Sequence, residues 1–242
     1  MSETENLDTE RNDMRLFHWI FFASLAAYSA VLIVAEMQTS QDFIRHYFSD
    51  IEGPRPFFAI NTTLSTFLLA GAAILLAFAA SSGGGGRTAR SRVFLWSQAS
   101  MLSFLAFDDR FQLHEALAYR IGIGDHFIMA AWGFIEAALI LALARKSEVT
   151  IRTAALVATG VGFFGVMMVF DAFVPHDMVL RLSIEDLAKS WAAAFFFSAA
   201  WCHSRAVLGL DRKAPTLADW IHNLPIIGAA PTPDANPAGI TK

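Results

Sequence analysis

The sequence has few of the residues on which several common protein classes depend. Only 17% of its 242 residues are charged, and it has a single cysteine, Cys202. One cysteine excludes an intrachain disulfide, and there is no CxxC pair or Cys/His zinc motif. The net charge of −4 is too small and too dispersed to indicate nucleic-acid binding. The glycine run at 83–86 lacks the spacing of a phosphate-binding loop.

Apolar residues are in excess. They make up 55% of the chain, including 22 phenylalanines, whereas a soluble domain has about 45–50% apolar and about 25% charged residues. The excess is concentrated in long uncharged blocks, which is typical of membrane proteins. We therefore expect an all-α, polytopic membrane helical bundle.

The apolar blocks predict six transmembrane helices, because a span needs about 20 mostly apolar residues. We expect a membrane domain over 16–206, with polar tails at 1–15 and 207–242 and no ordered structure in the first tail. The third helix should continue unbroken to Ala118, and an amphipathic piece should follow at about 217–227. The six expected spans are 16–37, 57–80, 92–107, 126–143, 151–173 and 184–203.

Three local patterns predict helix ends and contacts. Asp125 is expected to be the N-cap of the fourth span, and Ser183 that of the sixth. Three glycines in the fifth span are expected to permit close helix approach: Gly160, Gly162 and Gly165.

The positive charges predict the orientation. With six spans, twelve of the 18 Lys and Arg residues lie on the side of the two termini. The positive-inside rule then places both termini in the cytoplasm of a multi-pass plasma (inner) membrane protein. Almost all other ionisable residues gather at the outer ends of the spans.

The first outer polar cluster follows an apolar run and contains Asp108, Asp109, His114 and Glu115. On one continuous helix, Asp108 and Glu115 share a stripe that faces the bundle. This pattern is typical of a site that binds a metal ion or a proton. The alternative is a membrane helix that emerges into water, where carboxylates are solvated.

The second outer polar cluster lies two apolar runs later and contains Asp171, His176, Asp177, Glu185, Asp186 and Lys189. Local structure offers an alternative explanation. Ser183 and Asp186 have the spacing of a capping box, and Glu185 and Lys189 that of an i,i+4 ion pair. If both clusters form one site, atoms from each should lie about 4–5 Å apart, as two ligands of one ion do.

Imidazole and carboxylate ligands favour Zn, Fe or Mn over Cu(I). The candidate metal ligands are Asp108, Asp109, His114, His126, Asp171 and His176. Glu115 or Glu185 is a candidate general base, and Lys189 is a candidate for stabilising negative charge.

Glu136 lies close to the middle of the fourth span. A charged residue there costs about 2.5–3.5 kcal/mol on insertion scales, so it is a candidate proton or ion relay. The alternative is a protonated side chain that is hydrogen-bonded to a neighbouring helix.

Three functions remain open. The leading hypothesis is a metal-dependent membrane enzyme, a hydrolase or an oxidoreductase, that acts on a lipidic or amphiphilic substrate. The second is an ion- or proton-coupled transporter with Glu136 as its relay. The third is a structural or accessory subunit with solvated acids. The expected partners are membrane lipid and, as an open alternative, a second copy of the chain, with no nucleic acid.

Overall fold

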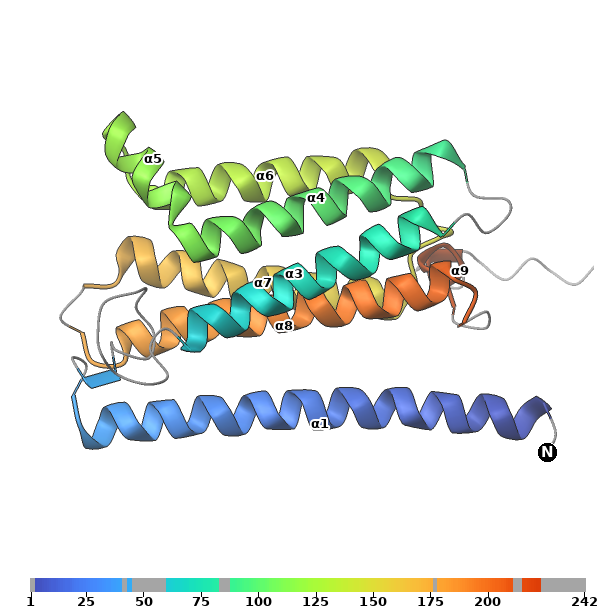
Figure 1. The fold of residues 1–242 in the computed structure, drawn as a ribbon, viewed down its shortest axis with the longest axis horizontal. Helices are drawn as coiled ribbons and strands as arrows, with labels where there is room; N and C mark the ends of the chain where they lie inside the picture. Colours follow the sequence, from blue (N-terminus) through green and yellow to red (C-terminus); the bar gives the residue numbers. More distant parts are fainter. Residues whose placement is uncertain are drawn as a thin grey trace, which may run out of the picture.

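The structure is a computed structural model that describes residues 3–40, 43–44, 60–82, 88–175, 178–210 and 215–222. These residues form a bundle of helices (Figure 1), with one isolated bridge between Thr150 and Thr216. The helices are α1 (Glu3–Gln38), α3 (Ile60–Ser81), α4 (Ala89–Phe111), α5 (Leu113–Ile121), α6 (Asp125–Leu143), α7 (Ile151–Phe173), α8 (Arg181–Val207) and α9 (Leu217–His222).

Four helical segments are long and apolar enough to cross a membrane: His18–Gln38, Ile60–Ser81, Asp125–Leu143 and Ile151–Phe173. The last two agree with the expected fourth and fifth spans to within a residue. Helices α4 and α8 are also long but carry more polar residues. The chain is therefore an all-helical protein with four candidate membrane-spanning helices.

Helix α8 is central to the packing. It lies against α7 and α3, and α3 also packs on α4 (Figure 1). Small residues of three helices form one core cluster, which includes Ala72 and Ala79 of α3, Ala99 of α4 and Ala200 of α8. Because alanines permit close helix approach, α3 packs closely against both α4 and α8.

Helix α1 runs alongside the bundle and contacts α8 (Figure 1). It begins at Glu3, so the expectation of no ordered structure was wrong for residues 3–15. Polar bonds attach it: Tyr28 Oη donates to Asn61 Oδ1 at 3.4 Å, and Trp191 Nε1 donates to Ser29 Oγ at 2.9 Å. In an apolar environment such interhelical hydrogen bonds add to van der Waals packing.

The expected unbroken helix to Ala118 was wrong. Gln112 has a left-handed backbone (φ 51°) that ends α4 and starts α5. Its amide N–H still donates to Asp108 O at 2.8 Å, and the next amide, that of Leu113, belongs to the new helix. The chain changes direction here, and α5 leaves the end of α4 at an angle (Figure 1).

Both expected N-caps were also wrong. The N-cap of α6 is Gly124, and Asp125 is the first helical residue, where an acid favours the helix dipole. The N-cap of α8 is Leu180 rather than Ser183. Glu36 of α1 replaces a local cap, because its carboxylate accepts Leu180 N–H at 3.1 Å and the Ser183 hydroxyl. The capping box of Ser183 and Asp186 is therefore not formed.

Only one of the three expected glycine contacts is present. A Cβ on Gly160 would lie 2.7 Å from Phe196 Cε1, so α7 and α8 approach closely at this point. A Cβ on Gly162 or Gly165 would meet nothing within 4 Å. The expected amphipathic piece begins at Leu217 as α9, and its continuation from 223 to 227 lies outside the described residues.

Candidate functional site

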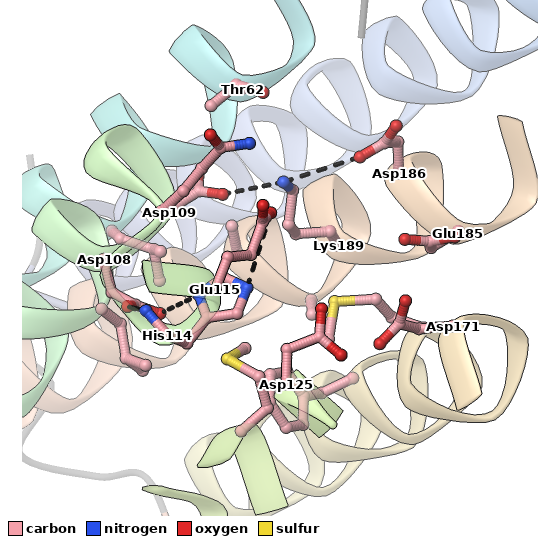
Figure 2. A pocket seen from close by; sticks show the side chains of 18 of the residues that line it. Thr62, Asp108, Asp109, His114, Glu115, Asp125, Asp171, Glu185, Asp186 and Lys189 are labelled. Atoms are coloured by element: carbon pink, nitrogen blue, oxygen red, sulfur yellow. Dashed lines mark hydrogen bonds and ion pairs between the residues drawn. The ribbon is translucent and has the colours of Figure 1, made fainter. Parts of the chain in front are cut away.

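One end of the bundle contains a pocket of about 250 Å³ (Figure 2). Both polar clusters line it, although they are far apart in the sequence. Its polar wall comprises Thr62, Asp108, Asp109, Gln112, His114, Glu115, Asp125, Asp171, Glu185, Asp186 and Lys189. Its apolar lining comprises Leu69, Leu105, Met129, Phe164, Met167, Leu182, Ala192, Ala193 and Phe196.

His114 and Asp108 form a hydrogen-bonded pair in this wall. The His114 Nδ1 atom lies 2.8 Å from Asp108 Oδ2, and the His114 backbone N–H donates to Asp108 Oδ1 at 2.8 Å. The left-handed residue Gln112 makes both contacts possible, because it turns the chain back over the end of α4. Asp108 is only 1% exposed, so its carboxylate fixes the ring orientation.

The environment of His114 raises its pKa. Burial acts to lower the pKa, but the hydrogen bond and charge of Asp108 outweigh it, with the charges of Glu115 and Asp125 adding to the effect. The His114 Nε2 atom lies 4.0 Å from Glu115 Oε1, whose side chain is half exposed. An imidazole held by a buried carboxylate through Nδ1 is a suitable general acid or base at Nε2.

Asp109 and Lys189 join the two clusters directly. Lys189 Nζ lies 2.8 Å from Asp109 Oδ1 and 3.6 Å from Asp186 Oδ1 (Figure 2). The hydroxyls of Ser65 and Thr66 also donate to Asp109. The expected pair of Glu185 with Lys189 is therefore replaced by a pair with Asp109, which crosses from α8 to α4, and a pair with Asp186 within α8.

Arg181 was missed as a site residue by sequence reasoning, which counted it only as an outer positive charge. Its guanidinium lies 3.0 Å from Glu185 Oε2 and 3.5 Å from Asp171 Oδ1. It is 7% exposed and also donates from Nε to Val174 O at 3.1 Å. An arginine one turn before two acids, Glu185 and Asp186, was the available signal, since i,i+4 pairs are local.

Asp125, His126 and Asp171 form the group that could hold a metal ion. Each offers one ligand atom, and these atoms lie within 4.8 Å of one another. No other group of three such residues is found in the part of the chain that the structure describes. Asp125 had been read only as a helix cap, so sequence reasoning missed this ligand. Its position at the start of α6, beside His126, was the only signal.

The other predicted metal ligands lie outside this group of three residues. Asp108 and His114 are bound to each other, and Asp109 is bound to Lys189. His176 lies outside the described residues. Figure 2 shows His114 and Glu115 on one side of the pocket and Asp171 and Glu185 on the other, with Asp125 between them.

Glu136 is not in this pocket. It lies farther along α6 and interacts with the side chain of Gln98 on α4. Its Oε2 atom is buried and has no hydrogen-bond partner among the described residues.

The pocket is electrostatically suited to a cation. Its seven carboxyl groups are contacted by the basic side chains of His114, His126, Arg181 and Lys189, so the acids outnumber the bases among the ion pairs of the described residues. Carboxylates at this density repel one another and lose hydration, so a bound cation or proton would stabilise them.

Comparison with known families found a match. The family model described as Domain of unknown function (DUF8692) matches residues 18–203, which include α3 to α7 and nearly all of α8. Comparison with curated proteins and with solved structures found no match.

Proposed function

The chain belongs to the family described as Domain of unknown function (DUF8692), and we propose that it is a metal-dependent membrane enzyme acting on a lipidic or amphiphilic substrate. The observation that carries this proposal is the composition of one pocket. The His114–Asp108 pair, two of the three potential metal ligands (Asp125 and Asp171) and an apolar lining meet there, with the third ligand, His126, next to Asp125.

The ion would be held by Asp125, His126 and Asp171. Oxygen and imidazole ligands suit Zn, Fe or Mn. Ligand atoms at about 2.0–2.2 Å from an ion lie within about 4.4 Å of each other, so small side-chain rotations complete this set. Three protein ligands leave a position for water or substrate, which is the arrangement of catalytic metal sites.

The reaction class that fits these residues best is metal-assisted hydrolysis. The ion would supply a nucleophilic water and polarise the scissile group. His114 would take or give the proton at Nε2, because Asp108 holds Nδ1. Glu115, beside His114, and Glu185, beside Arg181, are the alternative bases at the edge of the same pocket.

Lys189 has a supporting electrostatic role in this proposal. Because Asp109 and Asp186 both contact its ammonium group, the positive charge of Lys189 is already paired with two carboxylates before a substrate binds. It would keep the carboxylates of α4 and α8 together and moderate the negative field of the pocket. A substrate oxyanion would have to compete with these two carboxylates for it.

The apolar lining supports an amphiphilic substrate. Met129 of α6, Phe164 and Met167 of α7, and Phe196 of α8 lie in the same pocket as the acids. A polar head group would lie at the ionisable wall and an acyl or other apolar chain along these side chains. With the termini in the cytoplasm, this reaction would occur at the outer face of the membrane.

Metal analysis of the purified protein tests the proposal. We expect about one Zn, Fe or Mn ion per chain after reconstitution, and a loss of that ion in His126→Ala and Asp171→Asn. Glu148→Gln is the control, because Glu148 lies in the loop between α6 and α7, at the opposite end of the bundle, with Arg145 and Ser91. Equal metal content in the wild type and in all three variants would contradict the proposed metal site.

A turnover assay separates an enzyme from the other two functions. The protein in lipid nanodiscs would be incubated with a mixed lipid extract and the products identified by mass spectrometry. His114→Gln should abolish product formation while retaining the metal. Solute flux through proteoliposomes without any lipid product would favour the transporter instead.

A further inference from the structure

The ion pairs of the pocket leave a surplus of negative charge. Three basic side chains each contact two carboxyl groups, so at most one positive charge is shared by two acids in each set. These sets are Lys189 with Asp109 and Asp186, Arg181 with Asp171 and Glu185, and His114 with Asp108 and Glu115. The seventh acid, Asp125, contacts His126.

The surplus remains when the metal ion of the proposed function is counted. A divalent ion adds two positive charges, and His126 would be neutral as its ligand. With the charges of Arg181, Lys189 and a protonated His114, five positive charges then face seven carboxyl groups. Two negative charges are left when every carboxyl group is ionised, and a positively charged ligand would offset them.

The same contacts disfavour an anionic ligand. Lys189 Nζ lies 2.8 Å from Asp109 Oδ1, and the Arg181 guanidinium lies 3.0 Å from Glu185 Oε2. A phosphate or carboxylate would have to displace these partners and approach other carboxylates. Repulsion between like charges is stronger in a partly apolar cavity than in water, because the effective dielectric constant is lower. The pocket wall therefore discriminates against anions.

The size and lining of the pocket indicate an ammonium group at the end of an apolar chain. The volume of about 250 Å³ is smaller than the roughly 300–1,000 Å³ of sites for drug-sized ligands, so it holds a head group and the start of a chain. Phe164 and Phe196 line the same space. Aromatic rings attract ammonium groups, and quaternary ammonium ligands are commonly recognised in this way.

We propose that the pocket binds an amphiphile with an ammonium head group, which lies between Glu115 on one side and Glu185 on the other (Figure 2). The side chain of Glu115 is half exposed, whereas that of Glu185 is 20% exposed. The chain of the amphiphile begins along Phe164 and Phe196. As a statement about the substrate, this inference rests on the proposed function. As a statement about binding, it rests on the charge and shape of the pocket alone.

Native mass spectrometry of the full chain in neutral detergent tests this preference. Three probes are titrated: dodecyltrimethylammonium, dodecyl phosphate, which has the same chain, and tetramethylammonium, which has none. We expect one dodecyltrimethylammonium per chain, bound at least about tenfold more tightly than either of the other probes. A unit charge at contact distance is worth at least this factor at an effective dielectric constant of about 20.

Two variants and a control locate the site. Glu115→Gln and Glu185→Gln keep the size of the side chain and remove one charge, so each should weaken the binding of dodecyltrimethylammonium about tenfold. Glu148→Gln, at the opposite end of the bundle, should bind it as the wild type does. Because Glu115 is half exposed, its replacement disturbs the packing least and keeps the test valid if Glu185→Gln does not fold.

Two results would overturn the proposal: dodecyl phosphate binding as tightly as dodecyltrimethylammonium, or unchanged cation binding in every folded variant. Equally tight binding of tetramethylammonium would overturn the part that concerns the chain. Titrations with and without added Zn²⁺ separate this test from the metal analysis. Cation binding by a protein that takes up no metal would contradict the metal-dependent activity and support this inference, whereas a metal site without the cation preference would do the reverse.

Discussion

Asp108 shows how much of the pocket depends on one side chain. Its two carboxylate oxygens accept the backbone N–H and bind the ring of the same histidine, His114, while its own carbonyl receives Gln112 N–H. The backbone carbonyl of Asp108 thus takes part in the end of α4, while its carboxylate orients the start of α5 and holds the imidazole at Nδ1.

The raised pKa of His114 predicts how stability depends on pH. The ordinary value is 6.5, and the folded protein binds the proton more tightly than the unfolded chain does. The contribution of His114 to the free energy of unfolding is therefore complete below pH 6.5 and is lost as the pH rises through the raised pKa.

Removing the imidazole should abolish this dependence. We expect His114→Gln to lower the free energy of unfolding by roughly 1–2 kcal/mol at acid pH and by less at alkaline pH, because a hydrogen bond to a charged partner is lost. Unfolding in detergent across a pH series measures it. His222→Gln, on α9, is the control and should follow the wild-type profile. A profile of His114→Gln parallel to that of the wild type would contradict the argument.

At the scale of elements, the contact between α7 and α8 decides where the two halves of the pocket meet. Asp171 is near the end of α7, and Glu185 and Lys189 are near the start of α8. Gly160 permits this contact farther along, where Phe195 and Phe196 lie over its backbone. The sequence predicted close helix approach at three glycines, Gly160, Gly162 and Gly165. Only Gly160 faces α8, so only this position needs a residue without a side chain.

The two glycines give a matched prediction. An alanine at either position gains about 1 kcal/mol of helix propensity. Gly162→Ala adds a methyl group in open space and should be neutral or stabilising. Gly160→Ala must displace Phe196, whose ring carbon lies 2.7 Å from the new Cβ, and should lower the free energy of unfolding by about 1–3 kcal/mol.

Equilibrium unfolding of both variants in the same detergent measures this difference. Equal stabilities would show that α7 and α8 do not approach at Gly160 as closely as the structure describes. The pocket residues are unchanged in both variants, so any loss of metal from Gly160→Ala alone would report the helix spacing.

At the scale of the whole molecule, the charged residues are unevenly distributed between the two ends of the bundle. The pocket end carries the acids, while Arg90 at the other end caps α6 by donating to the carbonyl oxygens of Ala142 and Leu143. A cation at a helix C-terminus is favourable, and arginines close to a span are the strongest determinants of orientation.

Reporter fusions test the six-span topology and its orientation. A reporter after Lys242 should give a cytoplasmic signal, because both termini follow the side with more Lys and Arg. A reporter inserted at Gly122, in the turn between α5 and α6, should give an external signal. The reverse result would place the pocket at the cytoplasmic face. Signals from the same side would contradict the three crossings, an odd number, that the six-span topology places between that turn and the C-terminus.

The sequence alone determined the helical class and the places of the long apolar helices. The boundaries of α6 and α7 follow from hydrophobic runs that end at polar residues or turn signals, and these are local properties. It also identified most of the residues that line the pocket, since ionisable groups beside apolar runs are conspicuous. The break at Gln112 was not visible, because glutamine has no special preference for a left-handed backbone.

Only the tertiary structure decided which charges pair. Lys189 has acids within reach on its own helix, yet Asp109 of α4 is the nearest carboxylate at 2.8 Å. Asp125, which looked like a cap, meets His126 and Asp171, while Ser183 binds Glu36 instead of capping its own helix. Local spacing limits the possible partners of a charged group, but packing selects among them, because a buried carboxylate must be offset by whichever donor the neighbouring helix brings closest.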